Sequence, residues 1–307
     1  MNRNRRRLTT WLIVSAAVTL ISAVATAQMP VDHCGQTLAK SGTYVLTTDL
    51  DCSGTFANGI NVAASNIRFH LGNHTLSSAD CDLTKTIYGI FVPGNVSNVN
   101  LDGGKVRGFV DGVVLSSSKS RISAMTVTEA CQFGIAVQND RNVVTTSRVN
   151  HSGVDGIGLL FATNTRIIAN DISDNLGNGV GLSGSSHNFV AFNILSRNTA
   201  SGVLISGESF NTVANNEFDI NFDGIELEDT DNTVQQNTIR GSLDVGIYLA
   251  GSASPAHITH NAVLGSGLSD MSDASPSCAL NKWISNIFET DLVSGVSDGG
   301  PGRGCIR

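Results

Sequence analysis

The chain has little of what three common classes of protein need. After residue 27 no apolar run is long enough to span a membrane, so we expect no membrane span beyond that point. None of the 6 cysteines stands in a CxxC or Cys/His spacing, which argues against zinc held by cysteine. Basic residues are scarce, with 19 Lys and Arg against 26 Asp and Glu. A basic stripe is therefore lacking, which argues against a nucleic-acid partner.

The sequence also lacks helical periodicity. A helical repeat needs apolar residues at three- and four-residue steps and few glycines. Here apolar residues alternate, as in Ile157 and Leu159 or Ile225 and Leu227, and Gly and Asn recur where a helix would have to continue. Short alternating runs rich in Val and Ile, bounded by Gly, Asn, Asp and Ser, predict β-strands joined by turns.

A repeat of 22 or 23 residues takes the place of helices. One column of the repeat consists of glycines, and a second consists of polar turn residues flanked by apolar positions. The glycine column is Gly112, Gly134, Gly156, Gly179, Gly202, Gly224 and Gly246. The turn column is Ser147, Asn170, Asn193, Asn216, Asn237 and Asn261. Coils of this length close once around a cylinder and pair in parallel, about 4.8 Å apart.

The recurrence of asparagine at the turns can be explained by structure alone, without a functional role. It tolerates the left-handed backbone of a tight turn, and its amide can bond to the equivalent amide on the next coil. We expect one such ladder through Asn170, Asn193, Asn216 and Asn237, and a second through Asn175, Asn198 and Asn221.

The repeats resemble those of right-handed parallel β-helix proteins of the pectin-lyase-like superfamily. The resemblance is carried by GVLISGESFNTVANNEF (202–218) and GIELEDTDNTVQQNTI (224–239), and it covers roughly residues 56–290. It implies an all-β fold, a right-handed parallel β-helix with caps at both ends, and the right-handedness comes from the resemblance alone. The signatures of the superfamily's known enzymes, such as a paired Asp-Asp, Arg-Ile-Lys or Asp-Pro-His-Asp, are missing. No catalytic residue is therefore carried over from them.

Residues 1–27 have the pattern of a signal peptide. Four arginines precede an apolar core that ends at Ala25-Thr26-Ala27, so we expect cleavage after Ala27 and a secreted or periplasmic protein. An uncleaved anchor is the alternative. Without this segment the net charge is −11, from 15 basic and 26 acidic residues. We expect residues 28–307 to form one domain and a monomer, with an N-terminal cap at 28–56, coils at 57–265 and a C-terminal cap at 266–307.

The even number of cysteines in an exported chain predicts disulfides, although six cysteines allow 15 pairings. Position favours Cys34–Cys52 near the beginning and Cys278–Cys305 near the end. The remaining pair would be Cys81–Cys131. Ala79–Lys85 is an inserted loop in this alignment, and Ser266–Pro276 is expected to be a second, polar loop.

Aligned coils bring charged residues together on one outer face. Two positions after an apolar column stand His151, Asp174 and Arg197, which we take as candidate catalytic residues because His or a carboxylate can transfer a proton. Their neighbours are candidate substrate-binding residues, since Arg can hold a sugar carboxylate through two hydrogen bonds. These neighbours are Arg148, Asp171, Glu217, Asp219 and Arg240. The alternative is that these residues are ladder pairs of opposite charge, such as Arg148 over Asp171 and Asp219 beside Arg240.

Calcium is the one cofactor that the sequence suggests. Asp223, Glu226 and Glu228, with Asp219, Asp229 and Asp231 nearby, are dense enough in carboxylates to hold Ca²⁺. The alternative is a solvated acidic turn, because no spaced calcium-loop pattern is present.

Two functions remain open. The first is binding or processing of a polysaccharide, which we expect to be acidic, by a lyase-, hydrolase- or epimerase-like protein. The second is a non-catalytic scaffold of the cell envelope. The sequence leaves open whether the protein is an enzyme. A substrate groove would need walls, so the first function predicts that Ala79–Lys85 or Ser266–Pro276 stands beside the His151 face.

Overall fold

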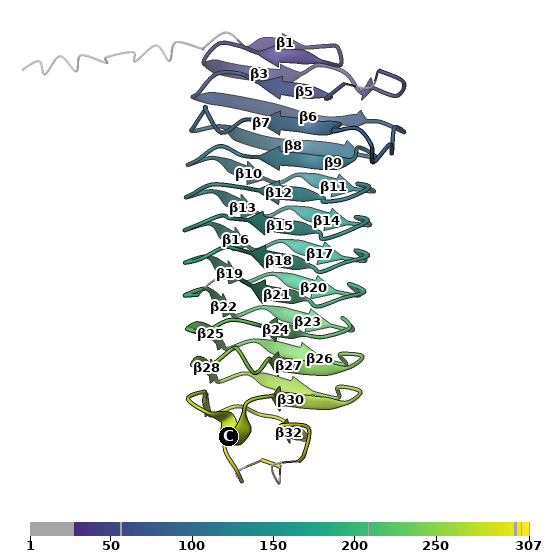
Figure 1. Ribbon diagram of the computed structural model, residues 1–307. Helices are drawn as coiled ribbons and strands as arrows, with labels where there is room; N and C mark the ends of the chain where they lie inside the picture. Colours follow the sequence, from purple (N-terminus) through teal and green to yellow (C-terminus); the bar gives the residue numbers. More distant parts are fainter. Residues whose placement is uncertain (1–27, 56, 208, 298–299, 302, 307) are drawn as a thin grey trace, which may run out of the picture.

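The protein is a single long stack of β-coils, seen in a computed structural model (Figure 1). The structure describes residues 28–55, 57–207, 209–297, 300–301 and 303–306, and the expected signal peptide lies outside them. Its strands pair in parallel in one 20-stranded and one 12-stranded sheet. No helix in the described part of the chain is long and apolar enough to cross a membrane. The predicted all-β parallel solenoid is confirmed.

The 12-stranded sheet takes one strand from each coil. Its strands are β2 (Gln36–Leu38), β5 (Ile60–Val62), β7 (Tyr88–Val92), β9 (Asp111–Leu115), β12 (Ile135–Val137), β15 (Ile157–Leu160), β18 (Val180–Ser183), β21 (Val203–Ser206), β24 (Ile225–Leu227), β27 (Val245–Leu249), β30 (Ser269–Asp273) and β32 (Asp291–Val293). We call its outer surface side three.

The 20-stranded sheet bends through a corner, so that most coils give it two strands. Its strands are β1 (Met29–Val31), β3 (Gly42–Leu46), β4 (Leu50–Asp51), β6 (Ile67–Ser77), β8 (Asn100–Arg107), β10 (Arg121–Ser123), β11 (Thr126–Thr128), β13 (Val143–Thr145), β14 (Arg148–Asn150), β16 (Arg166–Ile168), β17 (Asp171–Ser173), β19 (Phe189–Ala191), β20 (Ile194–Ser196), β22 (Thr212–Ala214), β23 (Glu217–Asp219), β25 (Asn232–Gln235), β26 (Thr238–Arg240), β28 (Ala256–Thr259), β29 (Ala262–Leu264) and β31 (Lys282–Ile284).

The corner divides the outer surface of this sheet into two sides. Side one is the outer surface of β10, β13, β16, β19, β22, β25 and β28, continued by the first halves of β6 and β8. Side two is the outer surface of β11, β14, β17, β20, β23, β26 and β29. The corner residues have positive φ, for example 57° at Ala169 and 58° at Phe192. A residue in this left-handed conformation bends the chain sharply within one position.

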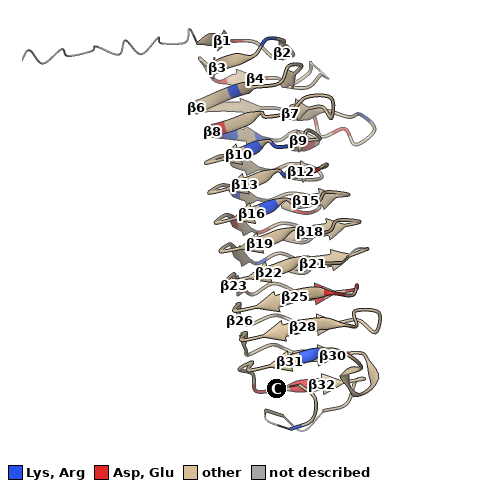
Figure 2. Ribbon diagram, turned by 90° about the vertical axis from the view of Figure 1, so that its left-hand side faces the viewer, with Lys and Arg blue, Asp and Glu red and all other residues tan. Residues whose placement is uncertain are grey.

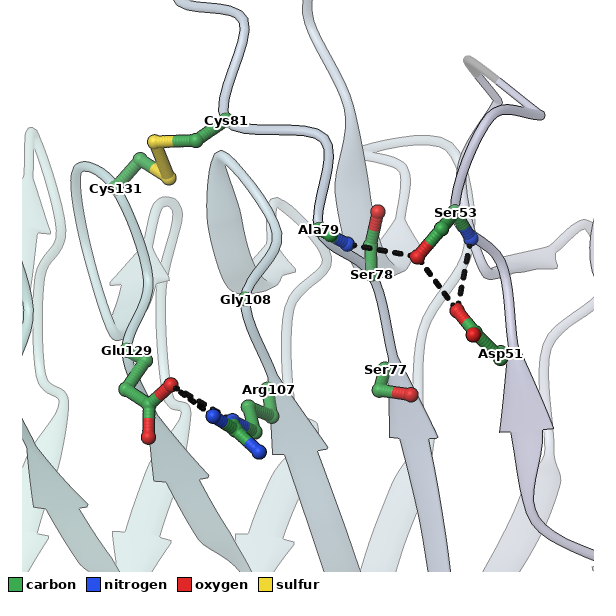
Figure 3. Close-up of a pocket in the computed structure, with 10 residues that line it drawn as sticks. All are labelled: Asp51, Ser53, Ser77, Ser78, Ala79, Cys81, Arg107, Gly108, Glu129 and Cys131. Atoms are coloured by element: carbon green, nitrogen blue, oxygen red, sulfur yellow. Dashed lines mark hydrogen bonds and ion pairs between the residues drawn. A yellow bond between two sulfur atoms is a disulfide. The ribbon is translucent and has the colours of Figure 1, made fainter.

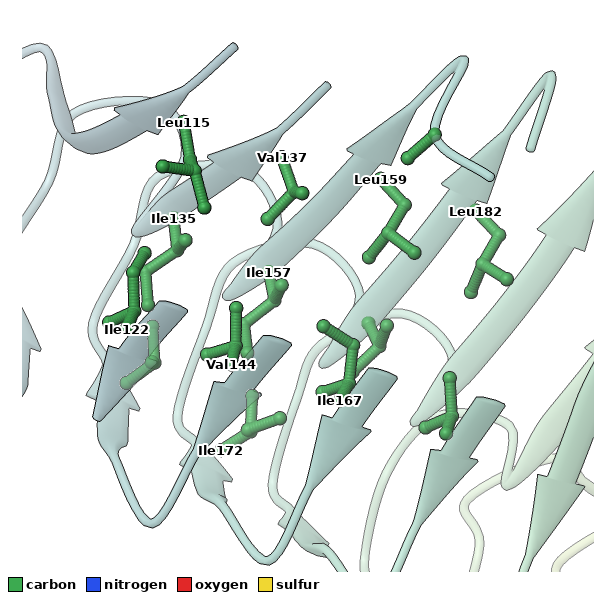
Figure 4. Close-up of a cluster of buried hydrophobic side chains, with 14 of the residues drawn as sticks. Leu115, Ile122, Ile135, Val137, Val144, Ile157, Leu159, Ile167, Ile172 and Leu182 are labelled. Carbon is green, nitrogen blue, oxygen red and sulfur yellow. The ribbon is translucent and has the colours of Figure 1, made fainter. Parts of the chain in front are cut away.

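The core is a column of stacked aliphatic side chains inside the coils. Figure 4 shows Leu115, Val137, Leu159 and Leu182 from the 12-stranded sheet opposite Ile122, Val144 and Ile167 from the other sheet. All seven are at most 1% exposed. Because side chains alternate along a strand, this inward column leaves the neighbouring residues on the outer surface, where function must be sought.

Asparagine ladders hold the corners, as predicted. Asn193 is buried, its Oδ1 accepts hydrogen bonds from the backbone N–H of Asn170 at 2.9 Å and from Asn170 Nδ2 at 3.0 Å, and its Nδ2 donates to the carbonyl of Ile167 at 2.9 Å. The second predicted ladder, through Asn175 and its two successors, is also present. A third ladder, through Asn188, Asn211 and Asn232, was not predicted.

All three predicted disulfides are present, namely Cys34–Cys52, Cys81–Cys131 and Cys278–Cys305. Parallel pairing reaches into both terminal segments. In 28–56, β1 pairs with β3, and β2 pairs with β5 of the first coil; in 266–307, β30 pairs with β27 of the last coils. Trp283 and Phe288 are buried at the C-terminal end of the stack.

The prediction of a polar loop at Ser266–Pro276 is wrong, because Ser269–Asp273 is the buried strand β30. Its two aspartates are tolerated there since each accepts several hydrogen bonds. Asp270 accepts from the N–H groups of Ser266 and Glu289, at 3.0 and 2.9 Å. Asp273 accepts from Trp283 Nε1 at 2.9 Å, among others. Satisfied carboxylates of this kind can lie in a core that polarity alone would exclude.

Candidate functional site

The predicted site residues lie at the outer end of side two. The strand register places Arg148 beside Asp171 and Asp219 beside Arg240. His151, Asp174 and Arg197 follow at the turn on three consecutive coils, with φ of 55°, 58° and 53°. The left-handed turn directs all three side chains outward, so the structure brings the three candidates together on one surface.

On this surface the arginines are neutralised. Arg197 holds Asp174 through two hydrogen bonds, of 2.7 and 2.8 Å. Arg148 pairs with Asp171 at 3.0 Å, and Arg240 pairs with Glu217 at 3.3 Å rather than with Asp219. One coil before His151, Arg107 pairs with Glu129 at 2.7 Å. These contacts correspond to the ladder-pair alternative.

The pairing limits what side two can do chemically. The hydrogen bonds from Arg197 hold the pKa of Asp174 below its usual range, so Asp174 is ionised at neutral pH and is no proton donor. The same pair raises the pKa of Arg197 and occupies the guanidinium edge that would bind a sugar carboxylate. His151 Nδ1 contacts Asn150 Oδ1 at 3.2 Å, and of the three catalytic candidates His151 alone has no ion pair in the described chain.

The acidic residues considered for calcium spread over several surfaces. Asp223 lies at the start of side three, where its Oδ1 accepts from the N–H of Val245 at 2.8 Å. Burial, helped by Glu226 and Asp244, raises the pKa of Asp223 to about 6. Burial also raises the pKa of Glu228, while Glu226 accepts from Ser201 Oγ at 2.9 Å. Among the residues that the structure covers, no group of three or more His, Cys, Asp or Glu is arranged to hold a metal ion.

The inserted loop forms one wall of a cavity of about 500 Å³ (Figure 3). The Cys81–Cys131 disulfide ties this loop to a coil further along the stack, while Arg107 and Glu129 form the opposite part of the lining. His151 is not part of the lining. The loop thus borders a space at the N-terminal end of side two, next to Glu129, one coil before His151.

Side one was missed by the sequence reasoning and carries a different charge pattern (Figure 2). Arg68, Arg121 and Arg166 are exposed and occupy one outward column, two coils apart in each step. No ion pair joins these three arginines to a carboxylate within the described ranges. The signal was available, because Arg121 and Arg166 directly precede the inward residues Ile122 and Ile167.

Aromatic rings continue this column. The Arg166 guanidinium lies over the ring of Phe189, 5.6 Å from its centroid, and both residues line a cavity of about 340 Å³ together with His187. The ring of His187 in turn contacts that of Phe210, with centroids 5.2 Å apart. Side one therefore has a part that carries the arginines, which we call the cationic end, followed by a part around Phe189, which we call the aromatic end.

A hydrogen-bonded His–Asp pair lies among the arginines. His70 Nδ1 is 2.9 Å from Asp102 Oδ2, and Ser123 Oγ donates to Asp102 Oδ1 at 3.2 Å. Asp102 is the single carboxylate in the two outward columns of side one, and its oxygens are engaged by these neighbours. The cationic end thus keeps an excess of positive charge.

Comparison with known proteins agrees with this architecture. The model of the family described as "Right handed beta helix region" matches residues 111–263. No curated protein matches the chain by sequence.

Solved structures similar to this chain share little of its sequence. They include the A-module of the mannuronan C-5 epimerase AlgE6 of Azotobacter vinelandii, with 14% identity, a TM-score of 0.58, and coverage of 89% of this chain and 91% of that one. An alginate lyase from Paenibacillus sp. str. FPU-7 has 12% identity, a TM-score of 0.53, and coverage of 74% and 94%.

A tailspike protein of Escherichia coli bacteriophage HK620, solved with a hexasaccharide, has 12% identity and a TM-score of 0.60 over 82% of this chain. The chain spans about half the length of that protein, 55%. At these identities the likeness concerns the fold alone. Given the family match, the parallel pairing of its strands and this shared architecture, the chain is a right-handed parallel β-helix protein.

Proposed function

We propose that this protein binds an anionic polysaccharide along side one. The observation that carries the proposal is the difference in charge balance between two sides of one sheet. On side two Arg148, Arg197 and Arg240 are each paired with a carboxylate. On side one the arginine column has no carboxylate partner in the described chain. An unpaired, exposed guanidinium is available for a ligand carboxylate or sulfate, which it binds through two hydrogen bonds.

The spacing of the arginines suits a polymer rather than a single small anion. Two steps of the coil repeat separate Arg68 from Arg121, and two more separate Arg121 from Arg166. With strands about 4.8 Å apart, neighbouring arginines of the column stand about 10 Å apart along the axis. A chain with charges at regular intervals, lying parallel to the axis, can meet each arginine in turn.

The aromatic end gives the same polymer a surface for its sugar rings. Phe189 lies directly next to Arg166 in the column, and His187 and Phe210 stand beside it at the turn. Aromatic faces bind flat apolar surfaces, and the CH groups of a pyranose ring form such a surface. An arginine followed by an aromatic ring along one column therefore matches a polysaccharide in which anionic groups and pyranose rings follow one another along the chain.

The fold neighbours make a saccharide ligand reasonable. By their names, the similar structures act on alginate or mannuronan or were solved with a hexasaccharide. Those statements concern other proteins of low identity, so the support is at the level of the fold. The choice of an anionic polymer rests on the arginines of this chain.

The three disulfides fit a protein that works outside the cytoplasm, because such bonds persist in oxidising compartments. The signal peptide predicted at residues 1–27, with cleavage after Ala27, would take it there. An exported polysaccharide-binding protein meets its ligand in the cell envelope or outside the cell.

Binding of the mature protein to alginate and polygalacturonate tests the proposal. The Arg121→Ala/Arg166→Ala protein should bind the anionic polymers at least roughly tenfold more weakly, since each exposed contact contributes about 1 kcal/mol. The matched control is Arg148→Ala/Arg240→Ala, which removes the same charge from side two. Equal losses in both proteins, or no loss in the first, would contradict the proposal. Added salt should weaken binding by the native protein because exposed charges are screened.

A further inference from the structure

A cavity of about 520 Å³ lies at the corner between side one and side two, apart from the arginine column. It is lined by Phe192, Asn215, Asn216, Glu217, Gln236, Thr238 and Arg240. From these residues we infer a second saccharide site, one that takes a neutral sugar ring. The inference does not depend on polymer binding at side one.

Phe192 is the unusual residue of this corner. Its side chain is 58% exposed and its φ is 58°, a conformation that bulky residues seldom adopt. The preceding coil has the small Ala169 at the same position and the following coil has Asn215. Two residues further on, Ile194 is also 49% exposed. Phe161 is likewise exposed, but Phe192 in addition lines the cavity, where its ring offers an apolar face to a ligand.

Polar groups without protein partners face the same cavity. Asn215 and Gln236 occupy the corner on the two coils after Phe192, and across the described residues neither side-chain amide makes a hydrogen bond. The adjacent Asn216 differs, since its amide is committed to the ladder through Val190 and Asn237. The free amides offer both donors and acceptors, which is what sugar hydroxyls require.

The charge of the cavity selects against an anion. Arg240 is neutralised by Glu217, whose Oε1 lies 3.3 Å from its Nη1. Glu217 is the neighbour of Ile194 in the strand register, so a carboxylate on the ligand would meet a carboxylate of the protein. A neutral hexose avoids this repulsion, stacks its CH face on Phe192 and directs its hydroxyl groups toward Asn215 and Gln236.

A site of this kind beside the arginine column gives one rigid molecule two saccharide surfaces of opposite preference. One takes charged polymers, and the other takes uncharged chains or the neutral residues of a mixed polymer. Two weak sites on one body reinforce each other when a ligand or matrix presents both groups.

The test measures binding of the mature protein to dextran, laminarin and galactomannan by affinity electrophoresis and calorimetry. The native protein should bind at least one of these polymers, and Phe192→Ala should bind it roughly five- to tenfold more weakly. The matched control is Phe161→Ala, because Phe161 is likewise an exposed phenylalanine, at 79% exposure and φ of 57°, outside the cavity lining. Its affinity should stay within about twofold of the native value.

Asn215→Ala combined with Gln236→Ala should weaken the same binding without changing alginate affinity. Circular dichroism and alginate binding of Phe192→Ala provide the check on folding and separate this site from side one. Absence of binding to all three neutral polymers would overturn the inference. Equal losses from Phe192→Ala and Phe161→Ala, or no loss from Phe192→Ala, would overturn it as well.

Discussion

Replacement of Asn193 by alanine tests how much the asparagine ladder contributes to stability. Asn193 is 1% exposed. Its Oδ1 accepts from the N–H of Asn170, and its Nδ2 donates to the carbonyl of Ile167. In Asn193→Ala both of these buried backbone groups lose their partners. The remaining ladder contacts keep alternatives, since Asn170 Nδ2 still reaches the carbonyl of Val144.

Leaving a buried donor or acceptor unsatisfied costs about 1–3 kcal/mol. With two such groups, Asn193→Ala should lower the free energy of unfolding by roughly 2–5 kcal/mol. The assay is urea denaturation followed by circular dichroism, together with hydrogen exchange of the amides of the affected coils. Stacked coils unfold in parts, so exchange at Asn170 reports the local effect directly.

The matched control is Gln235→Ala, an outward residue of β25 for which no side-chain hydrogen bond occurs in the described chain. It should change stability by no more than about 0.5 kcal/mol. A loss of under about 1 kcal/mol in Asn193→Ala, or unchanged exchange at Asn170, would mean that water replaces the amide. The reasoning about buried backbone groups would then fail for this corner.

Three further predictions concern charges and a disulfide. A raised carboxyl pKa means that the folded chain binds a proton more readily than the unfolded chain. Protonation of Asp223, with a pKa of about 6, therefore stabilises the fold as the pH falls through 6, and this stabilisation is lost as the pH rises above 6. Asp223→Asn should therefore raise the free energy of unfolding near pH 7.5 by roughly 1 kcal/mol and flatten its pH dependence, as urea titrations at several pH values would show; unchanged stability at both pH extremes would refute this. Because its partner Arg197 is exposed, Asp174→Asn should lower the free energy of unfolding by at most about 1 kcal/mol, as thermal denaturation would show. Asp174→Asn and His151→Ala should each leave alginate affinity unchanged. A tenfold loss of affinity in either variant would place the binding site on side two. The paired change Cys81→Ser/Cys131→Ser opens a loop of 50 residues, so it should lower stability by up to about 4 kcal/mol and make residues 79–85 sensitive to protease, whereas an unaltered digestion pattern would show that other contacts hold the loop.

The repeat made the fold predictable because equivalent positions of successive repeats pair with one another in a solenoid, so aligning the repeats gives the strand register. Once the column from Asn170 to Asn237 was aligned, the neighbours across coils followed, and the pairs Arg148–Asp171 and Arg197–Asp174 could be anticipated as adjacent residues. The alignment could not decide whether adjacent charged side chains form ion pairs with one another or remain unpaired and available to a ligand. The answer depends on side-chain geometry. The two hydrogen bonds between Arg197 and Asp174 show that these charges neutralise each other.

Side one was overlooked for a different reason. Its arginines alternate with the uncharged residues Asn100 and Val143 in the same column, so Arg121 and Arg166 do not stand out as a cluster in the sequence. Strand β30 was missed because its five residues include two aspartates, and a polar segment is normally solvated. Only the tertiary contacts, such as that of Asp273 with Trp283, reveal that the carboxylates are fully bonded inside the protein.

The direction of the asparagine ladder has a consequence for how the stack is built. Each asparagine amide satisfies backbone groups of the coil that precedes it. Asn193 hydrogen-bonds to the carbonyl of Ile167 and the N–H of Asn170, and Asn216 likewise accepts from the N–H of Asn193. The newest coil at the C-terminal end is then always the incomplete one, until Asn286 closes the series at Asn261. The hydrogen bonds of this corner can therefore be completed in order from the first coil to the last, which is the order in which a chain emerges from a ribosome or an export channel.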